Sequence, residues 1–547
     1  MLKKNRKRKR SMCAPFLEIG CVGVVALSAS VASAQDRCFR MIDLGEIGEV
    51  AETSGPFGIN NTGLAVFTKM VNGQRHAFVN VNSSSLNIIG AGNFDLHDLS
   101  GLEAGGESVA HDVNDSDIAV GWATFNGDKH AVVWRIDQYD PLETPPIPHV
   151  DLGLLDPLNS AYSEAFAIND DFPEPVIVGE GDVFEDCTCT GDPTNLIPRG
   201  FWRTLKDPPE DLTNAIRLIH TGASCYPTTI ASDVNTGPGG AGHETTAVGY
   251  GIKDLAPCFE DSHPKGHYWN DPSTGQGVLL AGAGNDGWSA RGMSDQGGIV
   301  GTVFFPYSAA YWPDINAAPV NIGSLIPGSH SSFAQRINNK DPAIEVIAAA
   351  GYRSATTILD EAVLWECAGE CSDPLINNWS FTELNTEVIL DCSEWHIRRA
   401  FDVNDEVSII CWARKFGPPS TEHAVILVPM ELCCPADLDG NGTVGTSDLL
   451  ILFANWGPCP APPESCFADL NRDCTVNTED QLILFANWGT CAVTAGGGGG
   501  GSSSLQAAVQ QLGFPSLAAH QAWLAQAGEM EAYASTYVLL TILQNQE

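Results

Sequence analysis

The phrases that decide the fold of this chain lie between residues 112 and 134. They are Asp112-Val113-Asn114, then Val120-Gly121, and then His130-Ala131-Val132-Val133-Trp134. Alternation in the last phrase places large apolar side chains on one face of an extended strand. Asn and Gly between such phrases favour tight hairpins, as in Asn60-Asn61-Thr62-Gly63, because they tolerate positive φ. The stretch therefore predicts short strands joined by tight turns.

The same order of phrases recurs loosely from residue 40 to residue 430. Each unit has an apolar phrase, often with Asp-Leu-Gly, then Ile-Asn or Val-Asn, then an apolar strand that ends in Gly, and then an aromatic strand. The asparagine slot falls at Asn60, Asn114, Asn169, Asn235, Asn338 and Asn404, with Ser294 between Asn235 and Asn338. Steps of about 44 to 66 residues suit a four-stranded blade with variable loops.

These seven units predict a mainly β fold, a seven-bladed propeller over residues 35–431 with almost no helix. One four-stranded unit cannot bury both of its faces, so several units must stack. A closed ring of blades also leaves few exposed sheet edges.

The repeat resembles the extracellular repeat family named for its His-Ala-Phe signature, which this chain carries literally once, at His76-Ala77-Phe78. The resemblance implies an exported β-repeat domain, and it supplies no catalytic residues. Histidines recur at matching positions, and they admit two interpretations: a packed residue at a strand end, or a ring that holds a metal or ligand. They are His76, His130, His267 and His423.

A duplicated acidic segment follows the repeats. Two 12-residue loops, 437–448 and 469–480, each precede a copy of Leu-Ile-Leu-Phe-Ala-Asn-Trp-Gly. Calcium takes six to eight oxygen ligands, and loop positions 1, 3, 5, 7 and 12 supply them at this spacing. The predicted calcium ligands are Asp437, Asp439, Asn441, Thr443 and Asp448 in the first loop, and Asp469, Asn471, Asp473, Thr475 and Asp480 in the second. The helix after the first loop is expected to bury Leu449, Leu450, Leu452, Phe453 and Trp456. The alternative is a pair of acidic turns.

Residues 432–491 resemble the dockerin module, which is a duplicated calcium-binding unit. The resemblance implies two calcium ions and attachment to a cohesin-like protein or another cell-surface component. Cys474 stands at position 6 of the second loop, where Gly normally makes the sharp turn, so the second site is expected to bind more weakly. Cysteines flank the copies: Cys434 matches Cys466, and Cys459 matches Cys491.

The N-terminus has the pattern of a signal peptide over residues 1–34. A basic stretch from Lys3 to Arg10 precedes the apolar run Ile19 to Ala29 and the cleavage pattern Ala32-Ser33-Ala34. A membrane anchor is the alternative, but the apolar run is short for a span. We therefore expect a secreted or extracellular protein, with the periplasm or the cell surface as further locations, and no transmembrane helix.

Composition limits the classes of partner and indicates the redox state of the cysteines. The formal net charge of −39 argues against nucleic acid as a partner. Fifteen of the 17 cysteines follow the signal peptide, which in an exported protein favours disulfides and leaves at least one thiol free or bonded to another molecule. Cys367 and Cys371 are expected within disulfide reach; a zinc site is the rival, but the required CxxC pairs are missing from the sequence.

The C-terminal end has two further segments. Residues 492–504 contain a run of glycines and serines and are expected to be a flexible linker. Residues 505–547 are rich in Ala, Gln and Leu and are expected to be a helical tail, to which we assign no role.

Two functional hypotheses follow. The first is an exported, non-catalytic binding or scaffold protein that a dockerin-like module tethers to its partner. The second is a glycoside hydrolase in polysaccharide catabolism, with polysaccharide as its partner and the site in the propeller channel. A cluster of two or three acids with a Trp or Tyr in that channel would favour the second. The sequence contains neither a His-Glu-x-x-His nor a Gly-x-Ser-x-Gly motif.

Overall fold

The structure is a computed structural model, and it describes most of the repeat region and of the duplicated segment. The described residues are 38–48, 57–81, 92–171, 174–184, 196–206, 211–220, 228–236, 245–252, 264–270, 275–282, 287–303, 307–326, 329–339, 344–354, 360–368, 371, 378–389, 395–417, 419–430, 436–439, 442–459, 468–471 and 475–490.

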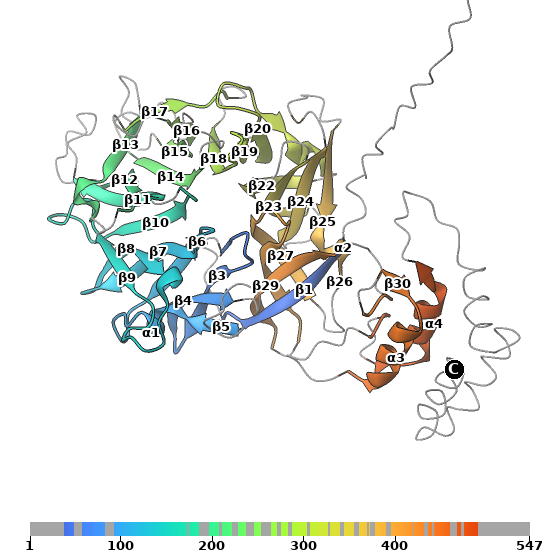
Figure 1. Ribbon diagram of the computed structural model, residues 1–547. Helices are drawn as coiled ribbons and strands as arrows, with labels where there is room; N and C mark the ends of the chain where they lie inside the picture. Colours follow the sequence, from blue (N-terminus) through green and yellow to red (C-terminus); the bar gives the residue numbers. More distant parts are fainter. Residues whose placement is uncertain are drawn as a thin grey trace, which may run out of the picture. The chain divides into compact units, whose positions relative to one another are not determined.

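The repeat region forms a propeller-like array of antiparallel sheets around a common centre (Figure 1). The prediction of a mainly β fold is confirmed. Helices described between residues 38 and 430 are single turns: α1 (Leu96–Leu99), α2 (Leu384–Glu387) and the 3-10 turns η2 (Ile136–Gln138), η3 (Leu212–Asn214) and η4 (Ile322–Leu325).

Four sheets contain four strands each, in the order of the chain. They are β2 (Gly58–Ile59), β3 (Ala65–Val71), β4 (Gln74–Val81) and β5 (Gly92–Asp95); β6 (Ser108–Val113), β7 (Ile118–Phe125), β8 (Asp128–Arg135) and β9 (His149–Gly153); β18 (Trp288–Met293), β19 (Ile299–Val303), β20 (Ser308–Trp312) and β21 (Val320–Asn321); and β22 (Ser329–Ile337), β23 (Ile344–Ser354), β24 (Asp360–Ala368) and β25 (Trp379–Glu383).

An eight-stranded sheet joins two further runs of four strands through their outer strands. The runs are β10 (Ser163–Ile168), β11 (Val176–Phe184), β12 (Leu196–Thr204) and β13 (Ile216–His220), and β14 (Thr228–Val234), β15 (Ala247–Ile252), β16 (Lys265–Trp269) and β17 (Gln276–Leu279). The link is parallel, with Ile219 opposite Gln276.

A five-stranded sheet brings the two ends of the repeat region together. It contains β27 (Trp395–Val403), β28 (Ile409–Lys415) and β29 (Thr421–Met430), and then β1 (Cys38–Glu46) and β26 (Val388–Ile389). Strand β1 runs antiparallel to β29 from Cys38↔Met430 to Glu46↔His423. The first strand of the described chain therefore completes its last large sheet.

A register shift in the first strand of most sheets explains the glycine of the repeat. In β6 the shift falls between Ala110 and Asp112, and Ala110 lies opposite Gly121 of β7. A Cβ at Gly121 would lie 2.0 Å from the Val109 carbonyl oxygen. A Cβ at Gly179, Gly249 or Gly301 would likewise lie only 1.9 to 2.0 Å from a carbonyl oxygen. The expectation that the strand ends in Gly is wrong, since each of these glycines lies inside its strand, as Gly121 does in β7. The position requires Gly because the shifted neighbour approaches its backbone too closely for a side chain.

The apolar cores lie between neighbouring sheets. One core joins Leu64 and Val79 of the first sheet to Val132 and Trp134 of the second. The tryptophans of the aromatic third strands are buried side chains in these cores: Trp134, Trp202, Trp269, Trp312 and Trp365. Neighbouring sheets thus bury one another, as the repeat requires, because each fully buried large side chain contributes roughly 1.5–3 kcal/mol.

The duplicated segment folds into two matched halves. Helices α3 (Thr446–Ala454) and α4 (Thr478–Ala486) contact each other, and two short strand pairs accompany them. Strand β30 (Thr443–Val444) pairs with β33 (Gly489–Thr490), and β32 (Thr475–Val476) pairs with β31 (Gly457–Pro458). Each loop thus pairs with the residues that follow the other helix.

Candidate functional site

A buried asparagine at the end of the first strand links one sheet to the next. Asn60 Nδ2 donates to the Asn114 carbonyl at 2.9 Å, and Asn114 Nδ2 donates to the Asn169 carbonyl at 3.0 Å. Asn169 donates to the Asn235 carbonyl, and Asn404 donates to the Asn60 carbonyl, both at 3.0 Å. The asparagine slot of the repeat is therefore a joint between sheets.

The residues directly after these slots form a second circle, which is closed. Each backbone N–H donates to the side-chain oxygen of the corresponding residue in the next sheet, over 2.6 to 2.8 Å. The circle runs through Asn61, Asp115, Asp170, Thr236, Asp295, Asn339 and Asp405 and returns to Asn61. Because every member must offer a side-chain oxygen, the position favours Asp, Asn and Thr.

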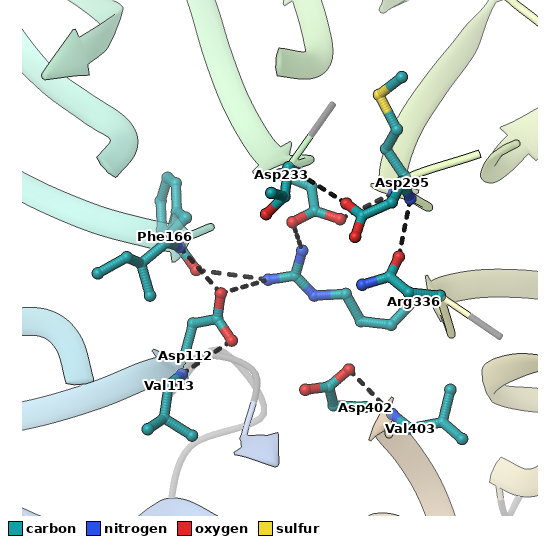
Figure 2. A network of polar contacts seen from close by, with 12 residues as sticks. Asp112, Val113, Phe166, Asp233, Asp295, Arg336, Asp402 and Val403 are labelled. Carbon is teal, nitrogen blue, oxygen red and sulfur yellow. Dashed lines mark hydrogen bonds and ion pairs between the residues drawn. The ribbon is translucent and has the colours of Figure 1, made fainter. Parts of the chain in front are cut away.

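Three aspartates and one arginine meet at the centre of this array (Figure 2). Asp112 comes from β6, Asp233 from β14 and Asp402 from β27, each at the register shift of its strand. Arg336 reaches them from β22 and forms an ion pair with Asp233. Its Nη2 lies 3.8 Å from Asp112 Oδ2 and donates to the Phe166 carbonyl at 3.4 Å.

The aspartates also bond the backbone of the following sheet. Asp112 Oδ2 accepts from Ile168 N at 3.0 Å, and Asp402 Oδ2 accepts from Ile59 N at 3.0 Å. Asp233 Oδ2 accepts from Met293 N at 2.8 Å. These carboxylates are therefore structural joints as well as charges.

Burial shifts the titration of two of the central acids. It raises the pKa of both Asp112 and Asp402, and the Arg336 guanidinium offsets only part of this rise. Burial likewise raises the pKa of Asp295 to about 7 and the pKa of Asp170 to about 6. A cavity of about 90 Å³ lies among these groups, with room for several water molecules.

A second charged cluster surrounds Glu164 of β10. Glu164 forms ion pairs with His111 and Lys129, and it accepts from the Tyr162 hydroxyl at 2.8 Å. Tyr162 also hydrogen-bonds to Glu180. Burial acts to raise the pKa of Glu164, but His111 and Lys129 outweigh it and lower the pKa to about 2. Burial raises the pKa of Glu180 to about 7, so Tyr162 bridges two carboxyl groups that titrate in different pH ranges.

The recurrent histidines lie in four different sheets, and three of them bond an aspartate. The pairs are His76 Nδ1–Asp95 Oδ2 at 2.8 Å, His130 Nδ1–Asp151 Oδ1 at 2.9 Å and His423 Nδ1–Asp43 Oδ1 at 2.8 Å. His267 instead bonds the Lys265 carbonyl at 2.7 Å. Asp43 and Asp151 begin the Asp-Leu-Gly phrases, so the two halves of the repeat signature meet as a side-chain pair. This arrangement gives the histidines a structural role.

One of these pairs has a third candidate metal ligand beside it. His76, Asp95 and Asp98 each offer a ligand atom within 4.8 Å of the others. However, the Asp95 carboxylate also accepts from His97 N at 2.9 Å and Asp98 N at 3.2 Å, and so caps helix α1. Capping and the histidine pair already account for this carboxylate.

The first acidic loop brings three of its predicted ligands together. Carboxylate oxygens of Asp437, Asp439 and Asp448 lie within 4.8 Å of one another. Oxygens on opposite sides of a calcium ion are about 4.6–5.2 Å apart, so the loop fits calcium. Asp448 is fully buried and accepts from Asp439 N and Gly445 N, at 3.1 and 2.7 Å. Thr443 of β30 and Asn441 were also predicted as ligands; Asn441 lies outside the described residues.

The second loop repeats this construction. Asp480 is buried and accepts from Asn471 N at 2.9 Å and from Asn477 N at 2.7 Å. Asp469 is buried as well, and Thr475 lies in β32 at the position that matches Thr443. Asp473 and Cys474 lie outside the described residues.

The core of the duplicated segment differs from the prediction at one position. Leu449 and Leu452 are buried, whereas Leu450 and Phe453 are half-buried. The expectation of a buried Trp456 is wrong: 43% of this residue is exposed. The reason is that α3 ends at Ala454, so Trp456 lies beyond the helical face, where its ring packs on the Phe453 ring.

The cysteine prediction is confirmed where the structure describes both partners. Cys367 and Cys371 form a disulfide with a Cα–Cα distance of 5.7 Å. Cys411 is a free, buried thiol. Cys459 is disulfide-bonded, while Cys434, Cys466 and Cys491 lie outside the described residues.

Several predicted segments lie outside the described residues. They are the signal peptide 1–34, the linker 492–504 and the tail 505–547. Among the helices that are described, none is long and apolar enough to cross a membrane.

The convergence of the central residues was not predicted from the sequence. Asp112, Asp233 and Asp402 stand two positions before the asparagine slot, where the other units have different residues, and Arg336 is one of these. A charged residue two positions before the asparagine slot is the signal that could have found them, because the slots of successive sheets bond one another around the same centre. The Glu164 cluster has no comparable signal, because its members come from four different strands and a loop.

No protein-family profile and no curated protein sequence matches the chain. Among solved structures, the tricorn protease has a TM-score of 0.34 at 10% identity, over 78% of this chain and 38% of its own. Acylaminoacyl peptidase has a TM-score of 0.31 at 10% identity, over 65% of this chain and 50% of its own. An alpha-L-arabinofuranosidase from Podospora anserina has a TM-score of 0.23 at 9% identity, over 72% and 97%. At these values the likenesses carry no information about activity.

Proposed function

We propose that the chain is an exported, non-catalytic binding or scaffold protein. In this proposal, a seven-bladed propeller of the His-Ala-Phe repeat type presents ligand-binding loops. A dockerin-like module at residues 432–491 binds two calcium ions and attaches the protein to a cohesin-like partner or another cell-surface component. Nucleic acid is not among the proposed partners, because the net charge of −39 repels phosphate.

The closed circle of hydrogen bonds supports the count of seven blades. It passes through seven equivalent positions before it returns to Asn61. The eight-stranded sheet supplies two of these positions, Asp170 after β10 and Thr236 after β14. We therefore interpret this sheet as two blades that share the β13–β17 link.

The convergence of Asp437, Asp439 and Asp448 is the observation that carries the proposed attachment function. Without a cation, three carboxylates at this distance repel one another, and one of them is fully buried. Calcium would replace this repulsion with charge-paired oxygen ligands at normal distances. Since the second loop repeats the buried carboxylate at Asp480, the arrangement suits two sites.

The charged groups of the centre and of the Glu164 cluster support a non-catalytic interpretation. Arg336 is ion-paired to Asp233, and Glu164 is ion-paired to both His111 and Lys129. A catalytic acid or base must meet its substrate, whereas these groups already meet internal partners. The charges thus hold the blades together.

The glycoside hydrolase alternative keeps one specific observation in its favour. Tyr162 hydrogen-bonds to Glu164 and to Glu180, and their pKa values of about 2 and about 7 differ as those of a nucleophile and a general acid do. This cluster matches the pattern of two acids with a tyrosine. If it is catalytic, Glu180→Gln abolishes the release of reducing ends from polysaccharides; if it is structural, the unaltered chain releases none.

Calcium-dependent attachment is the test of the proposed function. The mature chain is passed over immobilised cohesin domains and over cell-wall preparations, in calcium and then in chelator. We expect retention in calcium, release in chelator, and loss of retention in the Asp448→Asn/Asp480→Asn double variant. Retention that ignores both chelator and variant, or no retention on any surface, would contradict the proposal.

A further inference from the structure

The centre of the repeat domain holds more acids than bases. Asp112, Asp233 and Asp402 meet one guanidinium, that of Arg336 (Figure 2). Arg336 is the single cationic residue among the described residues that line the central cavity. When all three aspartates are ionised, this group therefore carries a net charge of −2.

The surrounding circle adds charge of the same sign. Asp115, Asp170, Asp295 and Asp405 belong to it and line the same cavity. Four acids of the circle thus line the same cavity as the central group of Asp112, Asp233, Asp402 and Arg336, which is already negative when its aspartates are ionised. Repulsion between like charges in a partly desolvated space is larger than at an open surface.

These acids stand at the joints between sheets. Asp402 bonds Ile59 N, which lies 343 residues earlier in the chain, and so joins the last large sheet to the first four-stranded sheet. Asp112 and Asp233 make the same kind of bond to Ile168 N and Met293 N. Repulsion among the carboxylates therefore pushes apart the strands that they connect.

We infer that the centre of the repeat domain is a proton-linked clamp. Protons held on Asp112, Asp402 and the acids of the circle tighten the ring of sheets, and their release as the pH rises loosens its joints.

The groups around each acid set the direction of the effect. Asp112 faces Arg336 from β22, Asp402 from β27 and Asp233 from β14, and burial is the largest influence that raises its pKa. Asp402 faces the same arginine and Asp233, with burial again the largest influence. Asp295, whose pKa rises to about 7, faces Asp233 as well.

The circle behaves in the same way. Asp295 faces Asp170 and Asp405, in addition to Asp233, and accepts from Thr236 N. Asp170, whose pKa rises to about 6, faces Asp115, Asp405 and its own neighbour Asp171. These neighbours are all acidic, so the negative charge of each one favours the protonated form of Asp295 or Asp170.

The sign of the pH dependence follows from these raised values. An acid whose pKa is higher in the folded chain binds more protons folded than unfolded. Stability therefore falls as the pH rises from about 4, the unfolded value, through the folded values, and then levels off. The domain is expected to be most stable in mild acid.

Thermal unfolding of the full mature chain tests the inference, with calcium held at saturation. We expect Tm to fall between about pH 5.5 and about pH 8.5, and Asp112→Asn to reduce this fall by at least about 2 °C. The matched control is Asp314→Asn, which removes one exposed charge from a turn and should leave the fall unchanged. If the Tm of Asp112→Asn falls with pH as much as the Tm of the unaltered chain, the inference of a proton-linked clamp is wrong.

Hydrogen exchange keeps the test decisive if Asp112→Asn does not fold. After correction for intrinsic rates, the amides of Ile59, Ile168 and Met293 should lose about tenfold protection over the same pH range. Asp402→Asn should reduce that loss at Ile59. Equal protection at both pH values in the unaltered chain would refute the inference without any variant.

Discussion

His423 Nδ1 lies 2.8 Å from Asp43 Oδ1, although 380 residues separate them in the chain. The same pair joins the third and fourth strands of other sheets, as His76–Asp95 and His130–Asp151. Strand β1 therefore gives the last large sheet the aspartate that its own repeat does not supply. Closure of the ring is specified by a side-chain pair as well as by backbone pairing.

Loss of Asp43 should open this closure. Asp43→Ala leaves the buried His423 ring without its carboxylate. It also removes the hydrogen bond that Gly45 N donates to Asp43 Oδ1 at 2.7 Å. We expect the free energy of unfolding to fall by about 2–3 kcal/mol, measured by urea denaturation. Asp151→Ala is the control, because it breaks the more exposed pair within one continuous sheet, and it should cost about 1 kcal/mol. Equal costs would show that closure does not depend on Asp43.

The glycine of the repeat should tolerate no side chain. In Gly121→Ala the new methyl group would lie 2.0 Å from the Val109 carbonyl oxygen, so β6 and β7 must separate. We expect a loss of about 3 kcal/mol in urea unfolding. In Gly417→Ala the nearest atom, the Pro419 carbonyl oxygen, lies 3.5 Å away, so stability should stay within about 0.5 kcal/mol. If the two variants unfold alike, the register shift does not explain the glycine.

Glu164 should dominate the acid limb of the stability curve. His111 and Lys129 lower the pKa of this carboxyl group, so its stabilisation is present above about pH 4.5 and is lost as the pH falls toward 2. Glu164→Gln leaves the buried His111 and the half-buried Lys129 without their anion and should cost about 3 kcal/mol near neutral pH. The variant should also lose less stability on acidification than the unaltered chain. Glu143→Gln, at an exposed site, is the control. If Glu164→Gln and Glu143→Gln lose the same stability on acidification, Glu164 does not dominate the acid limb.

The periodic part of the fold could be predicted from the sequence because each phrase has a local physical cause. Asn60 and its counterparts mark the joints, Gly121 and its counterparts mark the register shift, and Trp134 and its counterparts fill the cores. These causes repeat in most units, so a single sequence displays them several times. The calcium loops were predictable for a related reason, since ligand spacing lies within one short segment.

The charged centre could not be predicted in the same way. Asp112 and Arg336 meet only because the ring closes, and they stand 224 positions apart in the chain. The Glu164 cluster depends on how a loop residue, Tyr162, packs between two carboxylates from neighbouring strands. Such contacts depend on tertiary geometry and leave no periodic trace in the sequence.

The first acidic loop should bind calcium through a buried carboxylate and a left-handed glycine. Asp448→Asn removes the charge of the buried ligand and should abolish the tighter of two binding events in calorimetric titration of the mature chain. Gly442 has φ +83°, a conformation that costs a side chain about 1 kcal/mol, so Gly442→Ala should weaken this site about fivefold. Gly445→Ala is the matched control, because its Cβ would lie 4.0 Å from its nearest neighbour in unstrained backbone, and it should leave the affinity unchanged.

Cys474 stands in the second loop at the position of the left-handed Gly442, so the unaltered chain should show two unequal sites, the second weaker. Chelator should lower the helicity of residues 446–486 and calcium should restore it, because binding free energy becomes folding free energy in so small a module. An unaltered chain that takes up no calcium at millimolar concentration would reduce both loops to acidic turns.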